Sequence, residues 1–151
     1  RIPWLAEVTA LAEGYIADTQ PLINIELKGK GTAAAAARFL RTHPGLAVLV
    51  SSFNHEELAA FRETDKTTPV APLFERARGN MLETATQLGA SCINMSTRMA
   101  KPSLIEQCRE AEIPVLVYTV NQFHETQRLK AMGIAGVFTD RPDNLIPVIA
   151  T

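Results

Sequence analysis

Apolar and polar residues alternate along residues 22–28 of the chain. An extended strand would place its apolar side chains on one face and its polar side chains on the other: Ile23, Ile25 and Leu27 against Asn24, Glu26 and Lys28. In a closed parallel barrel the apolar face packs on helices, and the polar face looks into the barrel toward its C-terminal rim. A solvated strand face with an incidental charge pair is the alternative that the pattern leaves open.

Apolar runs of strand length and amphipathic runs of helical length alternate along the whole chain. The predicted strands cover residues 22–28, 46–53, 68–74, 91–96, 114–120 and 136–140. The predicted helices cover residues 2–15, 33–43, 54–64, 80–88, 102–111, 121–133 and 142–149. This alternation is typical of α/β proteins with a parallel sheet. No linker or low-complexity tract interrupts it, so we expect residues 1–151 to form a single domain.

Short polar residues mark the expected starts of three helices. Thr32 is predicted to cap the helix that follows the first strand. Asn54 is predicted to cap the next helix, with Glu57 three residues later in the spacing of a capping box. Asn121 is predicted to cap the helix that begins there, rather than to touch a substrate.

Two α/β architectures fit this order of elements. A doubly wound open sheet usually has a glycine-rich phosphate loop after its first strand. Gly29-Lys30-Gly31 matches neither the dinucleotide fingerprint nor the P-loop. Six strand–helix units also fit most of an eight-stranded barrel, which typically needs roughly 250 residues.

Composition and charge narrow the classes of function. The 151 residues are 46% hydrophobic and 21% charged, which is enough for a globular domain with a core. The net charge of −1 and the lack of a basic stripe argue against nucleic-acid binding. No apolar run reaches the length of a membrane span. Cys92 and Cys108 are predicted to be buried thiols, not a disulfide or a zinc site.

Five segments, in order along the chain, resemble motifs of the glycerophosphodiester phosphodiesterase family. Residues 24–28 resemble its Asn-Ile-Glu-Ile-Lys strand, and residues 50–54 resemble its Ser-Ser-Phe-Asp segment. Residues 118–121 are similar to its Trp-Thr-Val-Asn, and residues 133–143 to its Gly-Val-Asp-Gly-Ile-Ile-Thr-Asp-Arg-Pro-Asp. Residues 2–8 resemble its Ile-Pro-Thr-Leu-Glu-Glu-Val.

The resemblance implies a TIM (β/α)8 barrel, of which the chain matches strands three to eight. The family's first strand with His-Arg-Gly, its second strand with Glu-x-Asp and an insertion with a His-Asp pair have no counterpart here. The chain begins at Arg1 without a visible signal peptide, so we expect an N-terminally incomplete barrel that was processed, trimmed or cut from a longer protein. The family's catalytic histidines are therefore expected outside this chain. His43, His55 and His124 match none of them and are predicted to be solvated.

The resemblance also assigns roles to individual residues. Glu26 would be a metal ligand, and oxygen ligands suit Mg²⁺ or Ca²⁺. Lys28 would hold the substrate phosphate as a point charge. Phe53 would form an apolar wall beside the glycerol, with a core aromatic as the alternative, and Tyr118 would wall the pocket where the family has Trp. Asp140 is expected to serve turn chemistry and not catalysis.

These assignments imply metal-dependent hydrolysis of a small-molecule glycerophosphodiester to an alcohol and glycerol 3-phosphate. The complete protein would catalyse this reaction, and the chain alone is expected to be inactive because it lacks an acid and a base. The alternatives are a non-enzymatic remnant or interaction module, and a phospholipase D-like barrel acting on lipid phosphodiesters. Open edges on the third and eighth strands would allow a homo-oligomer. Family members occur inside and outside the cytoplasm, and we favour the cytoplasm.

Overall fold

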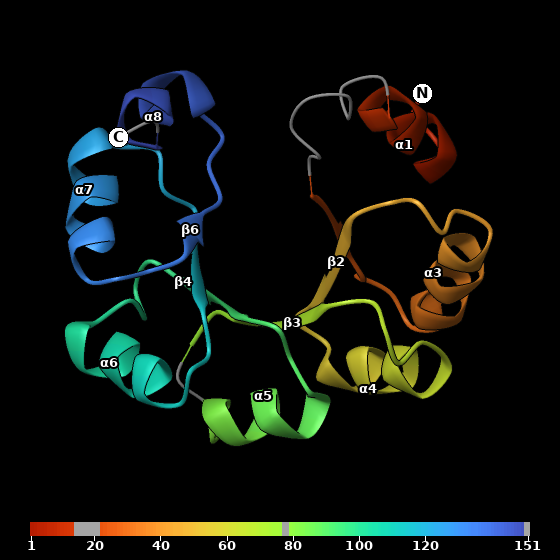
Figure 1. Ribbon diagram of the computed structural model, residues 1–151, viewed down its shortest axis with the longest axis horizontal. Helices are drawn as coiled ribbons and strands as arrows, with labels where there is room; N and C mark the ends of the chain where they lie inside the picture. The colour runs from red at the N-terminus through yellow and green to blue at the C-terminus, as the bar shows by residue number, and fades with distance from the viewer. Residues whose placement is uncertain (14–21, 77–78, 150–151) are drawn as a thin grey trace. The chain divides into compact units, whose positions relative to one another are not determined.

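Strands and helices alternate along the residues that the computed structural model describes, which are 1–13, 22–76 and 79–149. These residues group into two units, Arg1–Val70 and Ala71–Thr151. Strand β3 (Val70–Phe74) begins at the boundary between them. The alternation predicted from the hydrophobic pattern is confirmed in both units (Figure 1).

The first unit is built on two parallel strands. Its elements are α1 (Leu5–Glu13), β1 (Ile23–Glu26), α3 (Thr32–Arg41), β2 (Val48–Ser52) and α4 (His55–Thr64). The register of the strand pair places Glu26 beside Ser51. The backbone N–H of Leu27 donates to the carbonyl of Ser51 at 2.8 Å, which extends the ladder past the end of β1. Helices α3 and α4 lie against each other beside the strand pair (Figure 1).

The second unit contains the remaining elements. After β3 come α5 (Met81–Leu88), β4 (Ile93–Ser96), α6 (Pro102–Glu110), β5 (Val115–Tyr118), α7 (Phe123–Ala131), β6 (Gly136–Val137) and α8 (Pro142–Ile149). Strands β3 to β6 pair in parallel, each with the next along the chain. A doubly wound sheet reverses its strand order at a switch point, whereas a barrel keeps the chain order. The order in this unit is that of a barrel.

Burial explains why the strands could be recognised. Every residue of β2, β3 and β4 is buried, as expected for parallel strands covered on both faces. The core of the second unit includes Phe74, Ile93, Met95, Val117 and Leu129. Cys92 and Cys108 are buried free thiols, as predicted, and burial raises the pKa of Cys92 to about 11. No described helix combines the length and apolar character needed to cross a bilayer.

The helix caps of the first unit differ from the prediction. Asn54 does cap α4, because its side chain accepts a hydrogen bond from the N–H of Glu56 at 3.1 Å. Thr32 does not cap α3: Gly31 occupies the cap position in the left-handed region, and Thr32 lies inside the helix. Glu57 does not close a capping box on α4. Its carboxylate instead accepts from the N–H groups of Gly31 at 2.7 Å and Ala33 at 3.0 Å.

A carboxylate at the start of α3 is favourable because helix N-termini leave N–H groups without intrahelical partners and carry partial positive charge. Glu57 is well placed for this role since α3 and α4 are in contact. The backbone hydrogen bonds from Ala33 and Gly31 lower the pKa of Glu57. The N-terminus of α3 is therefore already occupied by an anion of the chain itself.

The first helix begins later than the sequence predicted. Helix α1 starts at Leu5 instead of residue 2, and residues 14–15 of the predicted helix lie outside the described residues.

Candidate functional site

A hollow of about 640 Å³ lies at the carboxyl ends of β1 and β2 in the first unit. Five residues line it: Glu26, Leu27, Lys28, Phe53 and Asn54. Three of the four site residues predicted from the sequence therefore come together in one place. The carboxyl ends of parallel strands are where α/β folds bind ligands, so the position itself is suited to a site.

Local hydrogen bonds fix the backbone around this hollow. The hydroxyl of Ser52 donates to the carbonyl of Leu27 at 2.6 Å and accepts from the N–H of Asn54 at 3.0 Å. Leu27 is buried, while Lys28 is exposed, as the alternation along this stretch predicts. The polar side chains of β1 are thus presented on the face opposite to the one that packs on the core.

The charges of the hollow are only weakly paired with each other. Lys28 Nζ lies 3.8 Å from Glu26 Oε2, and the side chains are 78% and 30% exposed. An ion pair this exposed contributes about 0–1 kcal/mol, so it holds the ammonium loosely. Phe53 is 49% exposed, which excludes the alternative of a buried core aromatic. The hollow therefore offers an accessible cation beside an accessible apolar ring.

The described residues do not make a divalent metal site by themselves. Within residues 1–13, 22–76 and 79–149, no three His, Cys, Asp or Glu side chains are arranged to hold a metal ion. Ca²⁺ takes six or more oxygen ligands, many of them from protein carboxylates or carbonyls, whereas Mg²⁺ keeps several waters and usually takes one or two protein carboxylates beside substrate phosphates. Glu26 can supply one carboxylate, and further protein ligands would have to come from elsewhere.

None of the three histidines belongs to a strand, in agreement with the sequence, but two of them are less solvated than predicted. His43 is half-buried, and its ring stacks on Phe39 with centroids 4.1 Å apart. His55 is also half-buried, at the start of α4, and His124 is exposed on α7. Packing on a neighbouring aromatic ring explains the difference at His43.

Tyr118, the fourth predicted site residue, belongs to the second unit. It lies at the end of β5 and lines a hollow of about 230 Å³ with Glu75, Ser96, Thr97, Arg98 and Thr119. The hydroxyl of Ser96 donates to the carbonyl of Glu75 at 2.9 Å. Glu75 directly follows β3 and Arg98 lies two residues beyond β4, a signal that could have identified both from the sequence.

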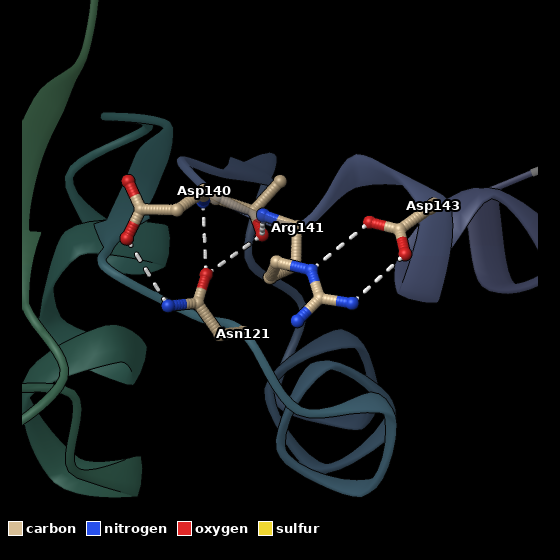
Figure 2. Close-up of polar contacts among 5 residues, drawn as sticks. Asn121, Asp140, Arg141 and Asp143 are labelled. Carbon is tan, nitrogen blue, oxygen red and sulfur yellow. Dashed lines mark hydrogen bonds and ion pairs between the residues drawn. The ribbon is translucent and has the colours of Figure 1, made fainter.

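Asn121 joins the segments that follow β5 and β6 (Figure 2). Its side-chain oxygen accepts from the hydroxyl of Thr139 at 3.0 Å and from the N–H of Asp140 at 2.9 Å. Its amide nitrogen donates to Asp140 Oδ2 at 3.1 Å. The prediction that Asn121 caps α7 is wrong, since the cap position is Gln122. An amide donates and accepts at once, and here both functions are used by the neighbouring turn.

Asp140 and the residues after it form a polar turn, as the sequence predicted. The N–H of Arg141 donates to the hydroxyl of Thr139 at 3.0 Å. The guanidinium of Arg141 donates to Asp143 at 3.2 and 3.1 Å, as Figure 2 shows. Asp140 therefore contributes to the connection into α8.

Comparison with known families and proteins gives a consistent result. Residues 13–144 match the model of the glycerophosphoryl diester phosphodiesterase family. A curated glycerophosphodiester phosphodiesterase of Caldanaerobacter subterraneus subsp. tengcongensis is 25% identical over 155 residues. That match covers 99% of this chain and 62% of the relative, so the chain spans less than two thirds of its length.

Solved structures show the same fold. A phosphodiesterase of Oleispira antarctica in complex with the product sn-glycerol-3-phosphate matches with a TM-score of 0.89 and 23% identity, over 99% of this chain and 62% of that one. A putative glycerophosphodiester phosphodiesterase of Galdieria sulphuraria matches with a TM-score of 0.86 and 18% identity, over 99% and 65%. The predicted fold class, part of a TIM barrel, is confirmed.

Proposed function

Because the chain belongs to the glycerophosphoryl diester phosphodiesterase family, we propose that it is part of an enzyme that hydrolyses glycerophosphodiesters to an alcohol and glycerol 3-phosphate. The observation that carries this proposal is the hollow at the ends of β1 and β2, where Lys28, Glu26 and Phe53 meet. The complex of the Oleispira antarctica relative with sn-glycerol-3-phosphate supports a ligand that bears a phosphate and a glycerol.

Lys28 is the proposed phosphate-binding residue. Its ammonium is a compact charge on a flexible stem, and it is 78% exposed at the hollow. Its contact with Glu26 at 3.8 Å is weak, so a phosphate with two or more negative oxygens competes for it effectively. Phe53 supplies an exposed apolar surface against which the carbons of the glycerol can pack.

Tyr118 is the proposed substrate-binding residue of the second unit. Its ring is half-buried at the end of β5, and its hollow contains hydroxyl groups and the charged side chains of Glu75 and Arg98. A phenol can pack against an apolar group and exchange a hydrogen bond with an alcohol oxygen. The identity of the alcohol would depend on such contacts.

Hydrolysis of the diester needs a proton for the leaving alkoxide and a base that activates water. Among the described residues, no histidine lines the hollow: His43 follows α3, His124 belongs to α7, and His55, three residues after β2, begins α4. We therefore propose that acid and base come from residues outside this chain and that the chain alone is inactive. Mg²⁺ or Ca²⁺ is proposed for the complete enzyme, with Glu26 as one ligand, because the described residues form no cluster that could hold the ion by itself.

Calorimetric titration of the chain with sn-glycerol 3-phosphate tests the proposal. We expect saturable binding that Lys28→Ala weakens by at least about tenfold, because a charge-assisted contact to phosphate is lost. Lys30→Ala is the matched control, since this exposed lysine lies two residues away but does not line the hollow. Equal losses in the two variants would indicate unspecific attraction and would contradict the proposed site.

A further inference from the structure

Ser51 carries a hydroxyl with no hydrogen-bond partner among the described residues. The residue is fully buried, at 0% exposure, in the last part of β2. The neighbouring Ser52 is equally buried, but its hydroxyl both donates to Leu27 and accepts from Asn54. A buried hydroxyl without a partner destabilises a fold, and an alanine at the same position would avoid that cost.

The register of the strand pair places Ser51 directly beside Glu26. Side chains at paired positions of adjacent strands lie on the same face of the sheet, so Ser51 shares the face of Glu26. Phe53, two residues further along the chain, belongs to the same row and lines the hollow. Ser51 does not line the hollow itself, but it shares a face with Glu26, whose carboxylate is a hydrogen-bond acceptor at the hollow.

Binding of a phosphate would change the surroundings of Glu26. In the structure, the Lys28 ammonium lies 3.8 Å from the Glu26 carboxylate. A phosphate on Lys28 would draw this ammonium toward itself and would bring a second anion close to Glu26. The carboxylate then needs another donor, and the Ser51 hydroxyl is a neutral one on the paired strand.

We propose that Ser51 is a positioning residue for Glu26: its hydroxyl donates a hydrogen bond to the Glu26 carboxylate when Lys28 binds phosphate. This inference rests on the proposed function, because it requires a phosphate at Lys28. Under this proposal the Ser51 hydroxyl without a partner destabilises the free chain, and ligand binding removes that destabilisation. The proposal therefore predicts that replacement of the Ser51 hydroxyl weakens binding without lowering stability.

The test is titration with sn-glycerol 3-phosphate together with thermal unfolding of the same variants. Ser51→Ala should weaken binding roughly fivefold to tenfold, the effect of one hydrogen bond. Its unfolding temperature should stay the same or rise. Ser51→Cys, which keeps the volume but has only a weak donor, should weaken binding similarly. Ser52→Ala, the buried neighbour with both hydrogen bonds, should lower the unfolding temperature instead.

A double-mutant cycle shows whether Ser51 acts through Glu26. In a Glu26→Ala background the acceptor is gone, so Ser51→Ala should cause no further loss of affinity. An equal loss in both backgrounds, or wild-type affinity of Ser51→Ala, would overturn this inference and leave the proposed function intact if Lys28→Ala has lost binding. If Lys28→Ala binds as the wild type does, the proposed function fails and the inference fails with it.

Discussion

Asn121 and Asp140 are joined by two hydrogen bonds, one in each direction. The amide nitrogen of Asn121 donates to Asp140 Oδ2 at 3.1 Å, and its oxygen accepts from the Asp140 N–H at 2.9 Å. The N–H of Val120 also donates to the carbonyl of Phe138 at 2.9 Å. These contacts hold the segment after β5, which begins at Thr119, against the segment that leads into α8.

Replacement of Asn121 by Ala should destabilise the second unit. The change removes the acceptor of the Thr139 hydroxyl and of the Asp140 N–H, as well as the donor to the Asp140 carboxylate. Because the site is only partly buried, we expect a loss of about 1–2 kcal/mol in the free energy of unfolding, measured by urea denaturation. Asn121→Asp should be no better, since it places a second carboxylate beside Asp140.

Gln122→Ala is the control for this prediction. Gln122 is the next residue, occupies the cap position of α7 and makes no side-chain capping bond. Its replacement should change the free energy of unfolding by about 0.5 kcal/mol or less. Equal effects at the two positions would show that the Asn121 contacts do not contribute to stability.

Glu57 should make the stability of the first unit depend on acid pH. The hydrogen bonds from Ala33 and Gly31 lower its pKa below the ordinary value of 4.5. Its stabilising contribution is therefore complete above about pH 4.5 and is lost as the pH falls through the lowered pKa. In urea titrations, Glu57→Gln should be less stable than the wild type at pH 7, and the difference should shrink on acidification.

Glu56→Gln provides the comparison for Glu57. Glu56 also lies in the first turn of α4, but it is exposed, and the N–H groups of Gly31 and Ala33 donate to Glu57 instead. This variant should keep more of the wild-type stability at pH 7 than Glu57→Gln does. A larger loss in Glu56→Gln would mean that the charge acts on α4 and that the cap on α3 is unimportant.

Asp65 should also make the free energy of unfolding depend on pH, in a more acidic range than Glu57 does. Burial opposes its ionisation, but hydrogen bonds from Thr68 and Thr67 outweigh burial and lower the pKa from 3.8 to about 2. The contribution to stability is present above about pH 4 and is lost as the pH falls through about 2. Asp65→Asn should therefore unfold at lower urea than the wild type at pH 7, and the difference should shrink as the pH falls through about 2. A difference that is independent of pH would contradict this assignment.

Local sequence rules identified the elements, but they misassigned several caps. The buried strands were visible because most of their residues are apolar, although β2 ends in two serines and β4 contains Asn94 and Ser96. Glu57 has the spacing of a capping box on its own helix, yet its partners Gly31 and Ala33 lie 26 and 24 residues away. Asn121 likewise bonds to residues 18 and 19 positions further on. Such choices depend on which helices and turns are neighbours in space, and no local pattern contains that information.

In the candidate site, too, local sequence patterns predicted some features, while others depend on which segments are neighbours in space. Alternation along β1 was sufficient to place Glu26 and Lys28 on one face, and the strand pairing adds Phe53. The partners of Tyr118 in its hollow, including Glu75 and Arg98, come from three different strand ends. The unpaired hydroxyl of Ser51 could not be predicted either, because the adjacent Ser52 has the same residue type and satisfies its bonds.

The chain by itself should not hydrolyse glycerophosphodiesters with either Mg²⁺ or Ca²⁺. Its described residues provide the proposed phosphate-binding residue Lys28 and a single carboxylate at the hollow, but no cluster able to hold a metal. The assay should measure release of glycerol 3-phosphate from glycerophosphocholine, with a complete family member as the positive control. Metal-dependent turnover that Glu26→Gln abolishes would contradict the prediction, because the chain would then contain its own acid and base. Binding of sn-glycerol 3-phosphate without turnover is the expected result, since phosphate recognition needs Lys28 while bond cleavage needs proton transfer as well.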